Sequence, residues 1–472
     1  MNLLSLDLDV VHVILSEIKP TDAFRLALTC RAAHDVAYPR FLSEVVLGHP
    51  WRRTGPDRLV QFCTAMLADA SLRILHLREL IIHKTAFQPT RSTSTHSVLD
   101  SAAMAFLAEV LKYAVNLRSI CIHDTEELLE TMPEFRWPLA SLPNLQDVRF
   151  LHAGTRALDV LVSFGSQPRR LEIDFSGLPT DMDAPPPYKH EVLQNLMRNL
   201  VSMKLSRVAG MTLAIPAEHV WPKVEQFEIF GDLQSLQTFA SVFPNLRRLS
   251  LVSSYVEDGL HPVSWPYLDH VSTSCPIPLD GPVRRMELMY DLDVLLDSMP
   301  YSVWAPGTMS LLQKTMPVVL ACSPNMQILR WIANIVKSVR VLQVYVFQPI
   351  HPDNAGIEDV DTWLKCYVPI LSAVPLVAFT IARGLSKAVP AAELSRLASF
   401  AAAQIPTLKY VGFNLTAAWK SQSEWSNCEY SWYRVMRTEA ADASTNPAVV
   451  ALSDLEGSVV HHRLVETERT CS

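Results

Sequence analysis

The sequence predicts an α/β fold in which a small N-terminal three-helix module precedes a long, irregular α/β solenoid. Three observations lead to this prediction. The first forty residues carry helical apolar spacing broken by prolines, an apolar unit recurs from residue 77 onward, and 32 prolines stand against only 14 glycines. Abundant proline suits stiff connections between short elements. Scarce glycine disfavours phosphate-cradling loops, which need positive φ or close backbone approach.

The composition limits the class of protein and its partners. The 472 residues are 49% hydrophobic and 19% charged, which is enough apolar material for a large core. A repeat architecture lets one body grow past the usual domain size of about 150 residues, and no linker of changed composition divides the chain. Because 48 acidic residues outnumber 41 basic ones, we expect neither nucleic acid nor a membrane as a partner.

Targeting and redox signals indicate a protein that works inside the cell, in the cytoplasm, the nucleus or both. Residues 366–382 carry no charge, but this stretch is shorter than the roughly 20 residues that span a bilayer, and Pro369 and Pro375 interrupt it. We expect it to be buried in the fold. The N-terminus carries Asp7 and Asp9 where a signal peptide would be basic. The cysteines lack metal-site spacing and are expected to be reduced and mostly buried: Cys30, Cys63, Cys121, Cys275, Cys322, Cys366, Cys428 and Cys471.

The N-terminal segment predicts three short helices. The first has one apolar stripe, formed by Val10, Val11, Ile14, Leu15 and Ile18. Pro20 prevents it from continuing, and Thr21 or Asp22 is available to cap a second helix over residues 23–28. A third is expected over residues 31–38, ended by a proline. Helices this short cannot bury their apolar faces alone, so the module needs a partner surface.

This spacing resembles the F-box, the helical module that docks onto the Skp adaptor of cullin–RING ubiquitin ligases. The resemblance covers residues 4–47, and the matching positions are Leu6, Asp9, Val10, Val11, Ile14, Leu15, Ile18, Asp22, Cys30 and Arg31. Asp7, Ala23 and Ala33 depart from the pattern. The resemblance implies that the adaptor is bound by Leu6, Leu8, Val10, Val11, Ile14, Leu15, Ile18, Pro20, Leu26 and Cys30. The alternative is that these helices merely cap the solenoid.

The body of the chain, residues 70–415, repeats a unit of the form Φ-x-x-Φ-x-Φ, where Φ is apolar. Its first and last residues are Leu77 and Ile82, Leu117 and Ile122, Leu145 and Phe150, Leu200 and Leu205, Val224 and Ile229, Leu246 and Leu251, Leu268 and Thr273, Val283 and Leu288, Met326 and Trp331, Val339 and Val344, Leu376 and Ile381, and Leu408 and Phe413. An apolar residue followed by proline precedes five units, at Leu142, Trp221, Phe243, Trp265 and Ile405.

We call the apolar residue before each of these prolines a lead-in residue. The lead-in residues Trp221, Phe243 and Trp265 follow one another at intervals of 22 residues, a period that resembles the leucine-rich repeat. Alternate strand residues point inward, so Leu246, Leu249 and Leu251 are expected in the core. The aromatic residue before the proline is expected to fill the space under the turn. The asparagine usual after the strand is missing from nearly every unit and the spacings stretch, so we expect an irregular solenoid. The alternative is an α/β fold with ordinary buried strands.

Helical connections are expected over residues 101–113, 191–198 and 391–403, and loops over 90–97 and 178–189. The last segment, residues 416–472, crowds aromatic residues together: Trp419, Trp425, Tyr430, Trp432 and Tyr433. Strand-like runs at 448–452 and 458–465 close the chain. Combined F-box and leucine-rich-repeat proteins of mushroom-forming fungi often end in a tryptophan-rich cap, which this tail resembles. We expect it to cap the open end of the solenoid; the alternative is an aromatic binding patch.

The sequence lacks the motifs of catalysis, so no catalytic residue, cofactor or metal is predicted. Gly-x-Ser-x-Gly, nucleotide-binding fingerprints, His-Glu-x-x-His and paired cysteines are all missing. Asp181 and Asp183 share a proline-rich loop without further oxygen ligands. His461 and His462 fall in an expected strand, where neighbouring side chains point to opposite faces.

We therefore expect a non-enzymatic, substrate-recognition subunit of a Skp–cullin–F-box ubiquitin ligase, with the Skp adaptor, its cullin complex and an unknown target protein as partners. Target contacts are expected at outward strand positions, for which the sequence offers Arg247, Arg248, Asp269, Arg284 and Arg285. Arg169 and Arg170 form a similar basic pair, which would favour an acidic target. The alternatives are a repeat-type interaction scaffold outside a ubiquitin ligase and an enzyme on an α/β body.

Overall fold

The structure is a computed structural model that describes residues 6–49, 55–88, 100–177, 198–207, 220–231, 236–252, 261–290, 292, 301–346, 357–383, 389–415, 429–437 and 447–466. The chain divides into two compact units, Met1–Phe230 and Gly231–Ser472. The expected loops at 90–97 and 178–189, and all but the last residue of the expected helix 191–198, lie outside the described residues.

The N-terminal module consists of α1 (Leu8–Glu17), α2 (Pro20–Ala27) and α3 (Arg31–Ser43). Its small core is formed by Val11, Leu15, Ala27 and Ala37. The three predicted helices are therefore confirmed, with two corrections at their ends.

The first correction concerns α3, which runs through Pro39 to Ser43 instead of ending at residue 38. Proline costs a helix one backbone hydrogen bond, and packing beyond it offsets that loss. Leu42 is buried, and the Phe41 ring lies 4.6 Å from the Phe24 ring of α2.

The second correction concerns the start of α2, where Pro20 is the first helical residue and no side chain caps the helix. Proline suits this position because its missing N–H would have had no partner within the helix. Asp22 instead accepts a hydrogen bond from Arg25 at 2.9 Å.

In the first unit, the described strands form a parallel sheet in which each strand pairs with the next along the chain. They are β1 (Glu44–Leu47), β2 (Glu79–Ile82), β3 (Ser119–Ile122), β4 (Asp147–Phe150), β5 (Arg170–Asp174), β6 (Ser202–Ser206) and β7 (Gln226–Phe230). β1 was not predicted. It follows α3 directly, so the sheet begins inside the segment assigned to the helical module.

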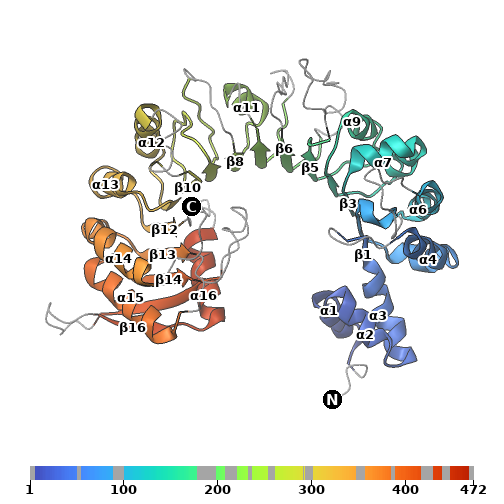
Figure 1. Ribbon diagram of the computed structural model, residues 1–472, viewed down its shortest axis with the longest axis horizontal. Coiled ribbons are helices and arrows are strands. Elements are labelled where there is room, and N and C mark those ends of the chain that lie inside the picture. The colour runs from blue at the N-terminus through green and yellow to red at the C-terminus, as the bar shows by residue number, and fades with distance from the viewer. Residues whose placement is uncertain are drawn as a thin grey trace. The chain divides into compact units, whose positions relative to one another are not determined.

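Helices connect these strands and cover one face of the sheet, the face that carries the core (Figure 1). They are α4 (Pro56–Leu67), α5 (Ala70–Arg73), η2 (Ile74–His76), η3 (Lys84–Ala86), α6 (Ser101–Tyr113), α7 (Thr125–Thr131), η4 (Pro133–Phe135), α8 (Arg136–Ala140) and α9 (Thr155–Val162). The predicted helix 101–113 is confirmed by α6, whose N-terminus is capped by Asp100 through the backbone N–H groups of Ala102 and Ala103, both at 3.0 Å. We call the opposite face of each sheet its inner face.

The second unit repeats this plan and adds an antiparallel end. Its parallel strands are β8 (Arg248–Val252), β9 (His270–Thr273), β10 (Arg285–Leu288), β11 (Val319–Cys322), β12 (Val341–Val346), β13 (Ala378–Arg383) and β14 (Tyr410–Asn414). β15 (Ser431–Met436) and β16 (Ala448–Ala451) continue the sheet with antiparallel pairing. The helices are α11 (Leu236–Val242), α12 (Tyr301–Thr315), α13 (Met326–Asn334), α14 (Ile357–Tyr367), η7 (Val368–Leu371), α15 (Ala391–Gln404), α16 (Asp454–His461) and the π-helical turn η9 (His462–Glu466).

The predicted alternation of buried and more exposed residues is confirmed in β5 to β8, whereas β11 to β14 are buried on both faces, and one predicted unit is misassigned. Leu246, Leu249 and Leu251 are buried. The unit from Met326 to Trp331, however, is the helix α13, because the Asn325 side chain accepts hydrogen bonds from the backbone N–H groups of residues 327 and 328 at 2.9 and 3.1 Å. The strand of that repeat is β11, which the apolar spacing missed.

The charge-free stretch 366–382 holds the end of α14, η7 and most of β13, and its strand residues are buried. The helix expected over 391–403 is confirmed by α15.

The residues that precede the prolines are buried as expected: Leu142, Trp221, Phe243, Trp265 and Ile405. Trp265 also donates from Nε1 to the backbone carbonyl of Phe243, 22 residues earlier, at 3.0 Å. One lead-in residue thus binds the corresponding residue of the preceding repeat.

Polar side chains also join successive repeats, at the start of the strands and not after them. Asn116 and Asn144 donate to backbone carbonyls of the preceding repeat at 2.9 and 2.8 Å. Ser338 and Thr407 make equivalent bonds at 3.0 and 2.8 Å. The asparagine ladder missing after the strands is therefore partly replaced by hydrogen bonds on their other side, which satisfy carbonyls left open by the turns.

The C-terminal prediction is half right. The expected strand 448–452 is β16, but the expected strand 458–465 is helical, in α16 and η9. A capping box explains the helix, because the Ser453 and Glu456 side chains each bind the other residue's backbone N–H.

Candidate functional site

The N-terminal module exposes apolar side chains that its own core does not use. Val10, Val13 and Ile14 of α1 are 45%, 64% and 36% exposed. Their spacing of three and four residues places them on one side of the helix. We call the exposed apolar residues of this module the docking face: Leu8, Val10, Val13, Ile14, Phe24 and Leu28.

The docking face differs from the set that the sequence assigned to the adaptor. Val11 and Leu15 lie in the module's own core, at 3% exposure each, so their assignment to the adaptor contact is corrected. The other assigned residues that are half-buried are Leu6, Ile18, Pro20 and Leu26, and those that are exposed are Leu8, Val10, Ile14 and Cys30. Sequence reasoning missed Val13, Phe24 and Leu28. Only Val13 carried a signal, through its spacing from Val10.

A pocket of about 900 Å³ lies beside this module. Its walls are mostly apolar and come from α2, α3, β1 and α4: Pro20, Tyr38, Phe41, Leu42, Val45, Leu59, Phe62 and Met66. Lys19, Arg58 and Arg73 also line it, together with Glu44. This pocket has room for an apolar group of small-molecule size.

The inner face of the first unit carries a ladder of alternating charge. Arg149, Glu172, Lys204 and Glu228 stand opposite one another on β4 to β7. Successive N–O distances between them are 3.8, 3.3 and 3.5 Å. Burial raises the pKa of Glu228, and the neighbouring Lys204 opposes that shift. Half-exposed pairs of this kind contribute little stability.

The basic pair Arg169 and Arg170 lies on the same unit, where it lines a pocket of about 570 Å³. A second pocket of about 680 Å³ is lined by Arg169 and Lys223 with several amide side chains. Arg170 is also 3.6 Å from the carboxylate of Asp147. Both arginines are exposed, as the expectation of a target-binding basic pair requires.

Two stacked histidines follow β2 and β3. The rings of His83 and His123 are 4.0 Å apart at an angle of 28°. Burial lowers the pKa of both; for His83 the charges of His123 and His49 add to this effect, and Asp124 opposes it. His152 lies 3.3 Å from Asp124. The stacked pair is therefore neutral near pH 7, which suits its packing.

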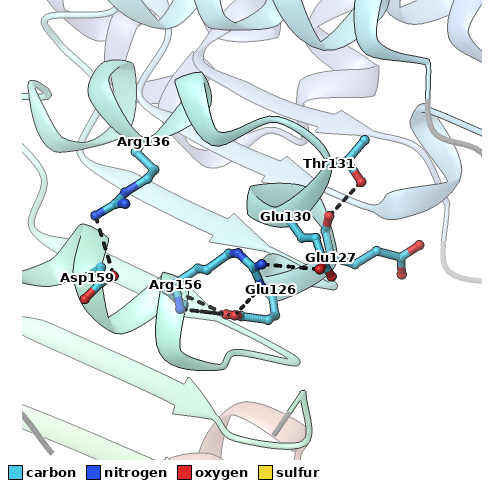
Figure 2. A network of polar contacts seen from close by, with 8 residues as sticks. Glu126, Glu127, Glu130, Thr131, Arg136, Arg156 and Asp159 are labelled. Atoms are coloured by element: carbon cyan, nitrogen blue, oxygen red, sulfur yellow. Dashed lines mark hydrogen bonds and ion pairs between the residues drawn. The ribbon is translucent and has the colours of Figure 1, made fainter.

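A carboxylate replaces the missing cap of α9 in the first unit (Figure 2). Gly154 is the N-cap of α9 and has no side chain to offer. Glu126 of α7 instead accepts hydrogen bonds from the backbone N–H of Arg156 at 3.1 and 3.2 Å and of Ala157 at 3.2 Å. A Cβ on Gly154 would lie 2.6 Å from Cδ of Glu126. Glycine is thus required here so that the neighbouring helix can supply the cap.

A buried ion pair occupies the inner face of β9 and β10. Arg285 Nη2 lies 2.6 Å from Oε1 of Glu287, and His270 Nε2 lies 3.3 Å from the same oxygen. Burial alone raises the pKa of Glu287. Hydrogen bonds from His270 and Ser272 and the charges of His270 and Arg285 outweigh it and lower the pKa to about 2. Arg285 is 4% exposed, so its assignment to target binding is corrected.

The C-terminal segment lies on the inner face of the second unit. Figure 1 shows α14 and α15 on one side of β13 and β14, and α16 on the other. We call residues 453–466 the cover segment. Its Val465 is fully buried in one cluster with Val319, Val341, Ala378 and Trp432. The sequence predicted only that the C-terminal segment caps the open end of the solenoid. This segment also covers part of the inner face of β11 to β13.

Trp432 joins the cover segment to the sheet. A Cβ on Gly412 would lie 3.3 Å from the indole, and a Cβ on Gly457 would lie 3.0 Å from its other edge. Two glycines thus let β14 and α16 approach the same ring. The rings of Tyr430 and His461 stack at 5.5 Å, so Tyr430 and Trp432 serve packing. Trp419 and Trp425 of the predicted aromatic set lie outside the described residues.

Arg284 also holds the cover segment. Its guanidinium donates to the backbone carbonyls of Val465 and Leu464 at 3.1 and 3.2 Å. A cation at these carbonyls satisfies acceptors that a helix end leaves open. Arg284 is half-buried and engaged by the cover segment, and its assignment to target binding stays a prediction. Of the remaining candidates, Arg247 is exposed, whereas Arg248 and Asp269 are half-buried.

Within the described residues, no group of three or more His, Cys, Asp or Glu is placed to hold a metal ion. Cys63, Cys121 and Cys275 are buried free thiols, Cys322 is buried as well, and burial raises the pKa of Cys63 to about 12. Over the same residues, no helix is long and apolar enough to cross a bilayer.

No family model matches the chain, and no curated protein matches its sequence.

Proposed function

We propose that this chain is the substrate-recognition subunit of a Skp–cullin–F-box ubiquitin ligase. The docking face carries the proposal: six apolar side chains stand exposed on helices whose residues match the F-box pattern. Isolated exposed apolar residues are ordinary, but six of them on two helices of so small a module favour a binding surface. Its partner in this proposal is the Skp adaptor.

The body of the chain supplies the second half of this function. Within each unit, repeats stacked in register give an extended surface on which a target can be held. The chain contributes no chemistry of its own in this proposal. It raises the rate of ubiquitin transfer by keeping target and ubiquitin-loaded enzyme close together, which turns an encounter into an effectively intramolecular step.

Adaptor capture tests the proposal. Purified Skp adaptor is titrated against the full chain, against Val10→Asp with Ile14→Asp, and against Leu72→Asp, which places the same charge at a 63% exposed leucine outside the module. Each aliphatic side chain buried at an interface contributes about 1.5–3 kcal/mol, so the double variant should bind at least about 100-fold more weakly. The Leu72 variant should bind as the wild type does.

The proposal fails if the wild-type chain captures no adaptor under conditions in which another F-box protein does. It fails equally if the double variant binds as tightly as the wild type. Ile18 is not substituted in this test because it packs against the module's core, and a charge there would disturb folding as well as binding.

The alternative is an interaction scaffold whose N-terminal helices cap the sheet. One observation favours it: α3 ends at Ser43 and β1 begins at Glu44, so the module is joined to the sheet without a linker. The same assay separates the two, because a scaffold cap would leave the adaptor unbound.

A further inference from the structure

On the inner face of the second unit, one row of aligned residues changes from charged to apolar along the sheet. On β8, β9 and β10 the row consists of Arg248, His270 and Arg285. On β11, β12 and β13 it continues with Val319, Val341 and Ala378. The apolar part of the row lies beneath Val465 of the cover segment. The sheet is therefore apolar where this segment lies and charged on the strands before it.

The next row on the same face contains buried polar side chains that have no hydrogen-bond partner. Gln343 and Thr380 stand opposite each other on β12 and β13 and are 1% and 0% exposed. The amide nitrogen and oxygen of Gln343 and the hydroxyl of Thr380 make no hydrogen bond. Buried polar groups normally have partners, because leaving them unpaired costs free energy. An amide and a hydroxyl side by side are suited to the N–H and C=O groups of a peptide.

The cover segment is attached to this face through several side chains. Val465 is buried, Arg284 binds the carbonyls of residues 464 and 465, and His461 stacks on Tyr430. On the helix itself, Leu455 and Val459 are 77% and 60% exposed. The covalent connection through β16 also gives the segment a high effective concentration at this face.

We propose that the inner face of β11 to β13 is a peptide-binding surface and that the cover segment occupies it as an intramolecular ligand. A target segment that presents an aliphatic pair to Val319 and Val341, and backbone amides to Gln343 and Thr380, takes its place. That the replacing peptide belongs to a ubiquitination target rests on the proposed function. That β11 to β13 form a peptide-binding surface, occupied by the cover segment, does not depend on it.

A peptide competition tests this inference on the full chain. The probe is a fluorescein-labelled synthetic peptide of residues 453–466, and binding is followed by fluorescence anisotropy. Val465→Asp places a charge in the buried cluster and should release the segment, which hydrogen exchange of residues 453–466 verifies. The probe should then bind at least tenfold more tightly than it binds the wild type. Val459→Asp, the same change at an exposed position of α16, should behave as the wild type does.

The inference is overturned if the probe binds wild type and Val465→Asp equally, or if it fails to bind the variant whose cover segment is released. If Val465→Asp does not melt cooperatively, Arg284→Ala replaces it in the same comparison. Adaptor capture by these variants should equal that of the wild type. Loss of probe binding with intact adaptor capture therefore counts against this inference alone, and the reverse result counts against the ligase proposal alone.

Discussion

Because Glu126 caps α9 from a neighbouring helix, one substitution at Gly154 should lower the stability of α9 in the wild type and raise it when Glu126 is removed. Glu126→Ala removes the acceptor of two backbone N–H groups at the start of α9. Loss of a cap costs about 0.5–2 kcal/mol, and loss of a negative charge at a helix N-terminus costs about 0.3–1 kcal/mol more. Together these terms predict that α9 is destabilised by about 1–3 kcal/mol.

Gly154→Ser should change the stability of α9 in opposite directions in the wild type and in the Glu126→Ala variant. The three atoms nearest to an added Cβ, at 2.6, 2.8 and 2.9 Å, all belong to Glu126. In the wild type the serine therefore displaces the carboxylate and destabilises α9 by about 1 kcal/mol or more. In the Glu126→Ala background the space is open, Gly154 has an extended backbone, and the serine can cap the helix itself. It should stabilise α9 by about 0.5–1 kcal/mol.

Hydrogen exchange of the α9 amides measures both effects locally, with a tenfold change in exchange rate for every 1.4 kcal/mol. Glu130→Ala is the matched control, because Glu130 is 62% exposed and pairs with the Arg156 side chain, at 3.3 Å. It should change stability by less than about 1 kcal/mol. The reasoning is refuted if Gly154→Ser has the same sign in both backgrounds, since the steric conflict with Glu126 would then not be what requires glycine.

Two further predictions concern packing within the repeats. The lowered pKa values of His83 and His123 mean that the folded state binds fewer protons than the unfolded state, whose histidines titrate near 6.5. Their contribution to stability is present above that pH and is lost as the pH falls below it. Urea unfolding measures the free energy of unfolding at pH 7 and at pH 5. The decrease between the two pH values should be smaller for the double variant His83→Asn with His123→Asn than for the wild type. Equal decreases would contradict the lowered pKa values of these histidines. Trp265→Phe removes the buried bond to the Phe243 carbonyl and should lower the free energy of unfolding by about 1 kcal/mol, whereas Tyr267→Phe, at a 61% exposed ring, should leave it unchanged.

The candidate sites show where sequence reasoning stops. The F-box resemblance located the right helices, and Val10 and Ile14 are exposed there as a contact requires. It could not tell which side of α1 faces its own core, because Val11 and Leu15 are as apolar as their exposed neighbours. That choice is made by Ala27 and Ala37 of the packed helices.

Local apolar spacing by itself determined the three N-terminal helices, most strands of the body and the burial of the residues before the prolines. These features follow from periodicity and turn chemistry, which act over a few residues. The continuation of α3 through Pro39 needed the contact between Phe41 and Phe24. The roles of Arg284 and Arg285 also came only with the tertiary structure. The bond from Arg284 to Val465 spans 181 residues, and a strand's own sequence does not record what later segment covers its face.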